Sequence, residues 1–268
     1  GYSGTNGTPS APSLNNQPGT AARPGAPQIE RDQIPGWTQV RPGSSSGPNQ
    51  MQRRAIRTRF WLSQNPRFVT NLLIGINTVV FLVSLLLSAT QGAGIQQLGG
   101  VDPNVLINLG AQVNFLVGQG QVWRIFTAMF LHLNILHIGL NMLSLFFVGT
   151  AIEVFYGKWR YLTIYLLSGI IGGVVSYFVE GPDFVAVGAS GAIFGVFGAL
   201  GVFYFVNRRA LGRYGTGAIT NWVFWLGLNL VFGFSDPNIG IIDHIGGLVA
   251  GMVIAAILIP RLERRRTL

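Results

Sequence analysis

The sequence contains no cysteine, a single lysine and few charged residues of any kind. Only 10% of its 268 residues are charged and 49% are hydrophobic, whereas an ordinary soluble domain carries about 25% charged residues. The lack of cysteine excludes a disulfide framework and a metal site built from thiolates. The lack of charge, together with a mean hydropathy of +0.43, places the chain in the membrane class before any motif is considered.

The N-terminal part of the chain differs in composition from the rest. Residues 1–52 are rich in Gly, Pro, Ser, Asn and Gln, and they hold too little apolar surface to offset the entropy lost on ordering. We therefore predict a disordered tail over residues 1–52, followed by a membrane domain over residues 53–268.

Six apolar segments follow this tail. Each is about long enough to cross a hydrocarbon core of ~30 Å as a helix. The segments cover residues 69–89, 135–152, 161–179, 190–206, 218–234 and 244–260. They predict an all-α, polytopic membrane protein with six transmembrane helices.

Positive charge alternates from one connection to the next. It precedes the first segment, recurs in the second and fourth connections, and follows the sixth segment. The residues are Arg53, Arg54, Arg57, Arg59, Arg67, Lys158, Arg160, Arg208, Arg209, Arg213, Arg261, Arg264, Arg265 and Arg266. Cytoplasmic connections carry such an excess, so both termini are predicted to be cytoplasmic. Because the basic residues lie at four separate borders on one side, they indicate contact with membrane lipid and no nucleic-acid partner.

The first external connection, residues 90–134, is long and nearly uncharged. Its apolar pieces, such as residues 105–109 and 113–117, are too short to span a membrane. We expect them to lie in the interface or to dip in against the protein.

Polar residues inside apolar segments are costly and are seldom kept without a reason. His137 and Asn141 are four residues apart in the second segment and therefore share one helix face. His132 lies just before that segment. Hydrogen bonds between helices would explain any one of these residues, so the histidines alone leave a structural and a functional role open.

Ser190 opens the fourth segment between Gly188 and Gly191. Taken alone, this pattern is explained at least as well by close helix packing. Its position adds weight, because the segment runs from outside to inside and places Ser190 at a helix N-terminus, where developing negative charge is favoured. The sixth segment runs in the same direction, so His244 enters the membrane at a similar depth.

Small residues give these two segments a way to meet. Gly247 and Gly251 follow His244 along one helix face, and the fourth segment offers a glycine strip over residues 191–198. If the strips pack together, His244 comes within about 2.6–3.2 Å of Ser190, as general-base activation requires.

Asp243 is the obvious candidate for a third catalytic group. Adjacent residues on a helix point about 100° apart, so we interpret Asp243 as an N-cap or a solvent-facing charge and predict a Ser–His dyad. Phe194 lies one turn below Ser190. It is placed to stack on the His244 ring, although ordinary helix packing explains it equally well.

Four motifs, taken in their order along the chain, resemble those of the rhomboid family of intramembrane serine proteases. The motifs are Trp123-Arg124, His132-x4-His137-x3-Asn141, Gly188-x-Ser190-Gly191 and His244-x-Gly-Gly247-x3-Gly251. The match covers roughly residues 70–260. It implies a six-helix bundle whose active site lies in a water-accessible cavity open to the outside.

The resemblance also implies a reaction. Ser190 would be the nucleophile and His244 the base, with His137 and Asn141 as oxyanion-stabilising donors. The implied substrate is a transmembrane segment of another membrane protein, cut near the external face, and the implied chemistry uses no metal and no organic cofactor. The implied location is a bacterial plasma membrane, with an organellar membrane left open.

The remaining family positions are expected to be supports. His132 looks like a structural member of the histidine cluster. Trp123, Arg124 and Glu153 look like structural supports of the first external connection and its junctions, although a solvated charge would explain Glu153 as well.

Two alternative functions remain open. A catalytically inactive relative would bind membrane proteins without cutting them, but both catalytic candidates and both oxyanion candidates are present. A small transporter would show internal repeats and polar residues at the midplane. The chain has no convincing repeat, and its polar cluster is predicted at external depth.

Overall fold

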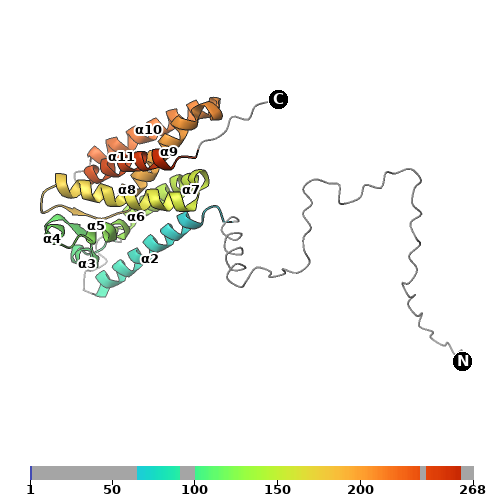
Figure 1. Cartoon of the computed structure of the whole chain (residues 1–268). Coiled ribbons are helices and arrows are strands. Elements are labelled where there is room, and N and C mark those ends of the chain that lie inside the picture. Colours follow the sequence, from blue (N-terminus) through green and yellow to red (C-terminus); the bar gives the residue numbers. More distant parts are fainter. Residues whose placement is uncertain (2–64, 91–99, 236–239, 261–268) are drawn as a thin grey trace, which may run out of the picture. The chain divides into compact units, whose positions relative to one another are not determined.

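The computed structural model describes residue 1 and residues 65–90, 100–235 and 240–260 (Figure 1). The predicted disordered tail, the domain boundary at residue 53, and most of the basic residues near either terminus lie outside the described residues. The fold described below is that of the membrane domain.

Long helices make up most of the described chain. They are α2 (Phe68–Thr90), a continuous helical stretch Ile135–Tyr156, α8 (Lys158–Val179), α9 (Ser190–Leu211), α10 (Arg213–Ser235) and α11 (Ile241–Leu258). Among the described residues, five of these are long and apolar enough to cross a membrane, all but α10. The prediction of a multi-pass helical membrane protein is therefore confirmed for five spans.

The fifth predicted span, residues 218–234, corresponds to α10, a helix of 23 residues. Its described part carries Thr220, Asn221 and Asn229, and these polar residues lower its hydropathy. The helix packs on α9, where Nε1 of Trp222 donates a hydrogen bond to the Phe197 carbonyl at 2.8 Å. A membrane-spanning α10 stays a prediction.

One helix boundary matters for the site. The sixth apolar segment was predicted to begin at His244, but α11 begins at Ile241 and ends at Leu258. The backbone N–H of His244 donates to the carbonyl of Gly240 at 3.2 Å, so this histidine completes the first turn of α11. The cause is that Ile241 and Ile242 are apolar and continue the helix upward to Gly240.

Helices α8, α9 and α11 pack against one another at the centre of the domain (Figure 1). Glycine makes this possible. A Cβ on Gly247 or Gly251 would collide with the carbonyl oxygen of Gly191 or Gly195 respectively, and a Cβ on Gly198 would lie 2.6 Å from the Leu248 carbonyl oxygen. The two glycine strips therefore meet as expected, with backbone against backbone.

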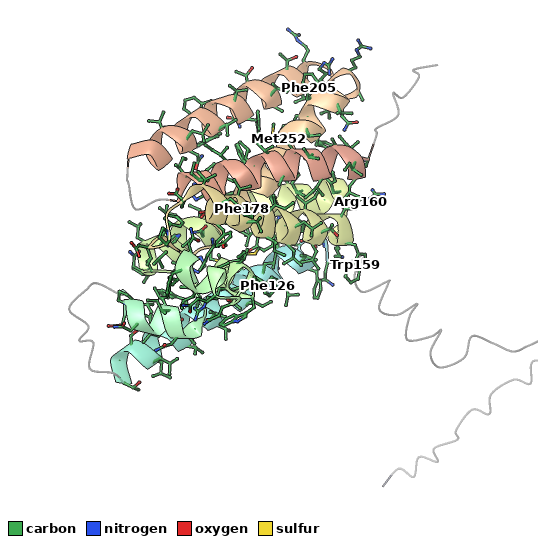
Figure 2. All side chains as sticks on the ribbon, turned by 60° about the vertical axis from the view of Figure 1, so that its left-hand side comes forward. Phe126, Trp159, Arg160, Phe178, Phe205 and Met252 are labelled. Atoms are coloured by element: carbon green, nitrogen blue, oxygen red, sulfur yellow. The ribbon has the colours of Figure 1, made fainter. Side chains whose placement is uncertain are left out.

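Both ends of α8 carry an exposed aromatic side chain. Trp159 and Arg160 lie at one end of α8 and Phe178 at the other (Figure 2). Trp159 is 75% exposed and Phe178 is 77% exposed, which is typical of aromatic residues at the two membrane interfaces. At the end that carries Trp159, Asn207 of α9 donates a hydrogen bond to the carbonyl of Pro260 at 3.3 Å.

The connection between the first two spans folds into short elements. They are α3 (Pro103–Leu109), β1 (Gln112–Val113), α4 (Asn114–Gly118), α5 (Arg124–Thr127) and the 3-10 turn η2 (Ala128–Phe130). None is long enough to span a membrane, as predicted. Strand β1 pairs antiparallel with β2 (Val185–Ala186), which precedes α9. This pairing joins the connection to the segment that leads into Ser190.

The second span contains an irregular turn. It consists of α6 (Ile135–Ser144), the π-helical turn η3 (Leu145–Gly149) and α7 (Thr150–Tyr156). A π-helical turn holds an extra residue within a helix and often lies near a functional site. Glycine suits position 149 of this turn, because a Cβ there would collide with the hydroxyl of Tyr161.

Candidate active site

Ser190 is the first residue of α9, and Ala189 before it makes no side-chain capping bond. The N–H groups of the first turn therefore have no side-chain cap from that position. The approach to Ser190 is set by Gly188, whose φ of +127° favours glycine. The backbone N–H of Gly188 donates to the Ala128 carbonyl at 2.9 Å, which fixes this turn to η2.

His244 reaches Ser190 from α11. Its Nε2 lies 2.7 Å from the Ser190 Oγ, within the range needed for proton transfer. The ring of Phe194 stacks on the His244 ring, with centroids 4.4 Å apart and planes inclined by 13°. His244 is buried, with 8% of its surface exposed. The stack holds the ring in one orientation.

The interpretation of Asp243 as an N-cap or solvent-facing charge was wrong. The N-cap of α11 is Gly240, and Asp243 is half-buried, with its carboxylate against α8 and α9. A Cβ on either Gly172 or Gly191 would lie 2.6 Å from the Asp243 Oδ1. Asp243 therefore faces away from the His244 ring. Within the described part of the chain, Nδ1 of His244 is buried and has no hydrogen-bond partner.

His137 lies on the other side of the Ser190 turn. Asn134 caps α6 by accepting a hydrogen bond from the His137 backbone N–H at 2.9 Å. A Cβ on Gly188 would lie 2.8 Å from the His137 Nε2, so the imidazole borders the turn directly. Asn141 follows one helical turn later and is buried, with one amide proton donated to the His137 carbonyl at 2.9 Å.

His132 is fully buried behind His137. The two rings meet edge to face with centroids 5.2 Å apart. Burial and, to a smaller extent, the neighbouring His137 lower the pKa of His132 from 6.5 to about 3. His132 is therefore neutral near pH 7 and packs against the imidazole that borders Gly188.

Arg124 is buried within the first external connection. Its guanidinium donates to the carbonyls of Ile107 at 2.7 Å and Ala111 at 3.0 Å and, through Nε, to the Gln121 side chain at 2.7 Å. The guanidinium carbon also lies 4.8 Å from the centre of the Trp123 ring. Arginine suits this place because its fork of donors satisfies several acceptors at once.

Glu153 is buried rather than solvated. Its carboxylate accepts three hydrogen bonds of 2.9 Å, from the backbone N–H groups of Val69 and Thr70 and from the Thr70 hydroxyl. The residue therefore caps the first turn of α2. It ties α7 to α2 at the end of the bundle remote from Ser190, and not to the external connection as the resemblance suggested.

Sequence reasoning missed two buried polar residues near the site. Gln112 donates from Nε2 to the Asn114 Oδ1 at 3.1 Å and to the Gly173 carbonyl at 3.0 Å. Asn114 in turn donates to the Gly181 carbonyl at 3.1 Å. The available signal was their polarity within the otherwise apolar run around β1.

The fold and the site together define a class. This is a multi-pass helical membrane protein in which a serine and a histidine, from the first turns of two glycine-packed helices, meet at hydrogen-bond distance. Among the described residues, no group of three or more His, Cys, Asp or Glu side chains is arranged to hold a metal ion.

Comparison with known proteins identifies the family. The model of the rhomboid domain matches residues 119–261, and the chain belongs to the rhomboid family. It is 43% identical over 160 residues to the rhomboid protease GluP of Bacillus subtilis, which covers 60% of this chain and 31% of GluP. The putative rhomboid protease YdcA of the same organism is 34% identical over 152 residues, which covers 57% of this chain and 75% of YdcA.

A plant relative is also similar. RHOMBOID-like protein 1 of Arabidopsis thaliana is 31% identical over 157 residues, which covers 58% of this chain and 40% of that protein. The matching region thus spans about a third of GluP and less than half of the plant protein.

Proposed function

We propose that this chain is an intramembrane serine endopeptidase that uses Ser190 and His244 as a catalytic dyad. The observation that carries the proposal is the 2.7 Å separation of the His244 Nε2 and the Ser190 Oγ. Membership of the rhomboid family supports the same activity. A dyad is favoured over a triad because, within the described residues, no carboxylate contacts the buried Nδ1 of His244.

In the proposed acylation step, the Ser190 Oγ attacks a peptide carbonyl while Nε2 of His244 takes its proton. The carbonyl oxygen becomes an oxyanion. When this intermediate collapses, His244 gives the proton to the leaving amine, and an acyl-enzyme remains on Ser190. A water molecule then attacks the ester, with His244 again as base, and releases the new carboxyl group.

The oxyanion would form beside the turn at Gly188. We assign its stabilisation to the His137 ring, the second amide proton of Asn141 and the backbone N–H of Ser190. The position of His137 against Gly188 and the start of α9 at Ser190 support this assignment. One donor aimed at a developing oxyanion is worth about 10²–10³ in rate.

The proposed substrates are transmembrane segments of other proteins in the same lipid bilayer. The site lies at the ends of α9 and α11, so cleavage would occur near one membrane face. A helical substrate hides its carbonyls in internal hydrogen bonds. It therefore has to unwind locally, which small or helix-breaking residues favour. From the alternation of charge we propose that this face is external, with both termini cytoplasmic.

A serine-directed fluorophosphonate tests the dyad without knowledge of the substrate. We expect the purified protein in detergent to be labelled, and we expect Ser190→Ala to lose labelling. Retained labelling of Ser190→Ala would show that another residue is the nucleophile.

A second assay separates an active enzyme from an inactive relative that only binds. A model transmembrane substrate should be cleaved by the wild type and left intact by Ser190→Ala. Cleavage by His244→Ala should be slower by about 10²–10⁴, the usual contribution of a general base. Equal rates for His244→Ala and wild type would remove His244 from the mechanism.

A further inference from the structure

An open groove lies between α4 and the end of α8. It encloses about 820 Å³ of empty space, part of it open to solvent. One wall is α4, and the other is the last turn of α8 with the residues that follow it. Phe115, Tyr177 and Phe178 give the groove aromatic walls. Of the described residues that line it, Glu180 alone is charged.

We infer that this groove binds the headgroup of a membrane lipid through an ammonium group, as phosphatidylethanolamine carries. The Glu180 carboxylate pairs with the ammonium, and the aromatic rings cover it. The inference goes beyond the proposed function, because lipid binding here requires neither Ser190 nor His244.

Depth in the membrane is the first argument. Helix α8 has 22 residues and is about 33 Å long at 1.5 Å per residue, which matches a hydrocarbon core of ~30 Å. Glu180 follows directly after this helix and therefore lies at the level of the lipid headgroups. Phe178 is exposed at the same end, remote from Trp159 and Arg160 (Figure 2). The groove is thus placed where headgroups and the outer ends of acyl chains meet the protein.

Charge is the second argument. Within the described part of the chain, the Glu180 side chain has neither an ion pair nor a hydrogen bond. Arg124 is the only Lys or Arg in residues 68–157, and its guanidinium is already engaged with backbone carbonyls. Residues 161–207 contain neither Lys nor Arg, and the basic residues of α8 lie in its first turn, at the other end. A cation from the surroundings therefore complements this carboxylate.

The chemistry of the lining residues is the third argument. A carboxylate only accepts hydrogen bonds, and a primary ammonium group donates three. An ammonium is also attracted to the face of an aromatic ring. Gln119 lines the same groove and offers amide donors to the lipid phosphate. An anionic headgroup has no ammonium for Glu180 and is repelled by its charge.

Hydrogen bonds hold the two walls of the groove together. The backbone N–H of Phe115 donates to the Pro182 carbonyl at 2.8 Å, and that of Asn114 donates to the Phe184 carbonyl at 3.1 Å. The Asn114 side chain donates to the Gly181 carbonyl at 3.1 Å. Because the walls are fixed before a ligand arrives, binding costs little ordering entropy.

Titration of the purified protein with short-chain lipids, followed by native mass spectrometry from detergent, tests the inference. Dihexanoyl phosphatidylethanolamine and dihexanoyl phosphatidylglycerol share their chains and phosphate, and only the first carries an ammonium. We expect the wild type to bind the ethanolamine lipid about tenfold more tightly, as one hydrogen bond to a charged group allows. Ser190→Ala should bind both lipids as the wild type does.

Three variants locate the site. Glu180→Gln keeps the size of the side chain without its charge and should bind the two lipids equally. Phe178→Leu keeps an apolar side chain without a ring face and should weaken binding of the ethanolamine lipid about threefold. Because Phe178 is exposed, this variant tests the groove even if Glu180→Gln does not fold, which thermal unfolding in the same detergent shows. Asp183→Asn is the matched control, since it removes an exposed carboxylate that does not line the groove, and it should keep the wild-type preference.

The inference is overturned if the wild type binds the two lipids with equal affinity, or if Glu180→Gln keeps the preference. A lysine tripeptide, which has no acyl chains, tests a different occupant. If it binds as tightly as the ethanolamine lipid and only when Glu180 is present, the groove receives a basic protein segment and the lipid assignment is wrong. Failure of the proposed function is separate, because loss of proteolysis or of fluorophosphonate labelling leaves the lipid affinities unchanged.

Discussion

Replacing Gly247 by alanine tests whether the contact between α9 and α11 sets the catalytic distance. A Cβ on Gly247 would lie 2.8 Å from the carbonyl carbon of Gly191 and closer still to its oxygen, whereas ordinary contact begins at 3.4 Å. The two helices would therefore have to separate there by more than 0.6 Å. Residue 247 is one helical turn below His244, so the displacement is carried to the site.

This separation exceeds what the Ser–His contact tolerates. The Nε2–Oγ distance is 2.7 Å, and a productive hydrogen bond extends to about 3.2 Å. Gly247→Ala should therefore lower kcat/KM about a hundredfold, the smaller end of the contribution of a general base. Overpacking should also destabilise the fold by about 1–3 kcal/mol.

Cleavage of a model transmembrane substrate in detergent measures the loss, and thermal unfolding in the same detergent measures stability. Gly75→Ala is the matched control, since a Cβ there meets nothing within 4 Å; it should keep wild-type activity. If Gly247→Ala is folded and keeps wild-type kcat/KM, the glycine contact does not set the Ser190–His244 distance and the reasoning fails.

Three further predictions follow from the same structure. Gly188→Ala should lower kcat about 10²–10³-fold with little change in KM, because its Cβ would displace the His137 ring; an unchanged kcat would remove His137 from oxyanion stabilisation. Because the folded-state pKa of His132 is lowered to about 3 from 6.5, stability is complete above pH 6.5 and should fall by about 1.4 kcal/mol per pH unit below it. Chemical unfolding of wild type and His132→Gln at several pH values measures this contribution, and the slope should be shallower in the variant. Glu153→Gln should cost about 1.5–3 kcal/mol of unfolding free energy, because an amide oxygen caps α2 less strongly than a carboxylate; equal stability would contradict the capping role.

The spans were predictable because hydropathy and length report directly on a membrane environment. The pairing of Ser190 with His244 was also within reach, since two glycine strips and a common depth pointed to it. The boundary at Ile241 was not, because the charged Asp243 interrupts the apolar run and makes the segment appear to begin at His244.

Asp243 shows the limit of sequence reasoning most clearly. The angle between adjacent helical residues separated it correctly from the His244 ring. That angle says nothing about what lies opposite, however, and the opposing surface consists of Gly172 and Gly191 from two other helices. In the sequence, a glycine gives no sign of which side chain will pack against it. Gln112 was missed for a related reason, since a strand of two residues has no visible period.

The π-helical turn Leu145–Gly149 sets how far the two halves of the second span, α6 and α7, are rotated relative to each other about the helix axis. Each residue added to or removed from a helix rotates everything beyond it by about 100°. His137 above the turn faces the serine, and Glu153 below it faces α2. Deleting one residue of the turn would leave either half intact and swing one against the other, so that the cap on α2 and the imidazole beside Gly188 could not both be in place. The extra residue in the turn thus sets the rotation between the two halves, so that one helix can place Glu153 against α2 and His137 beside Gly188.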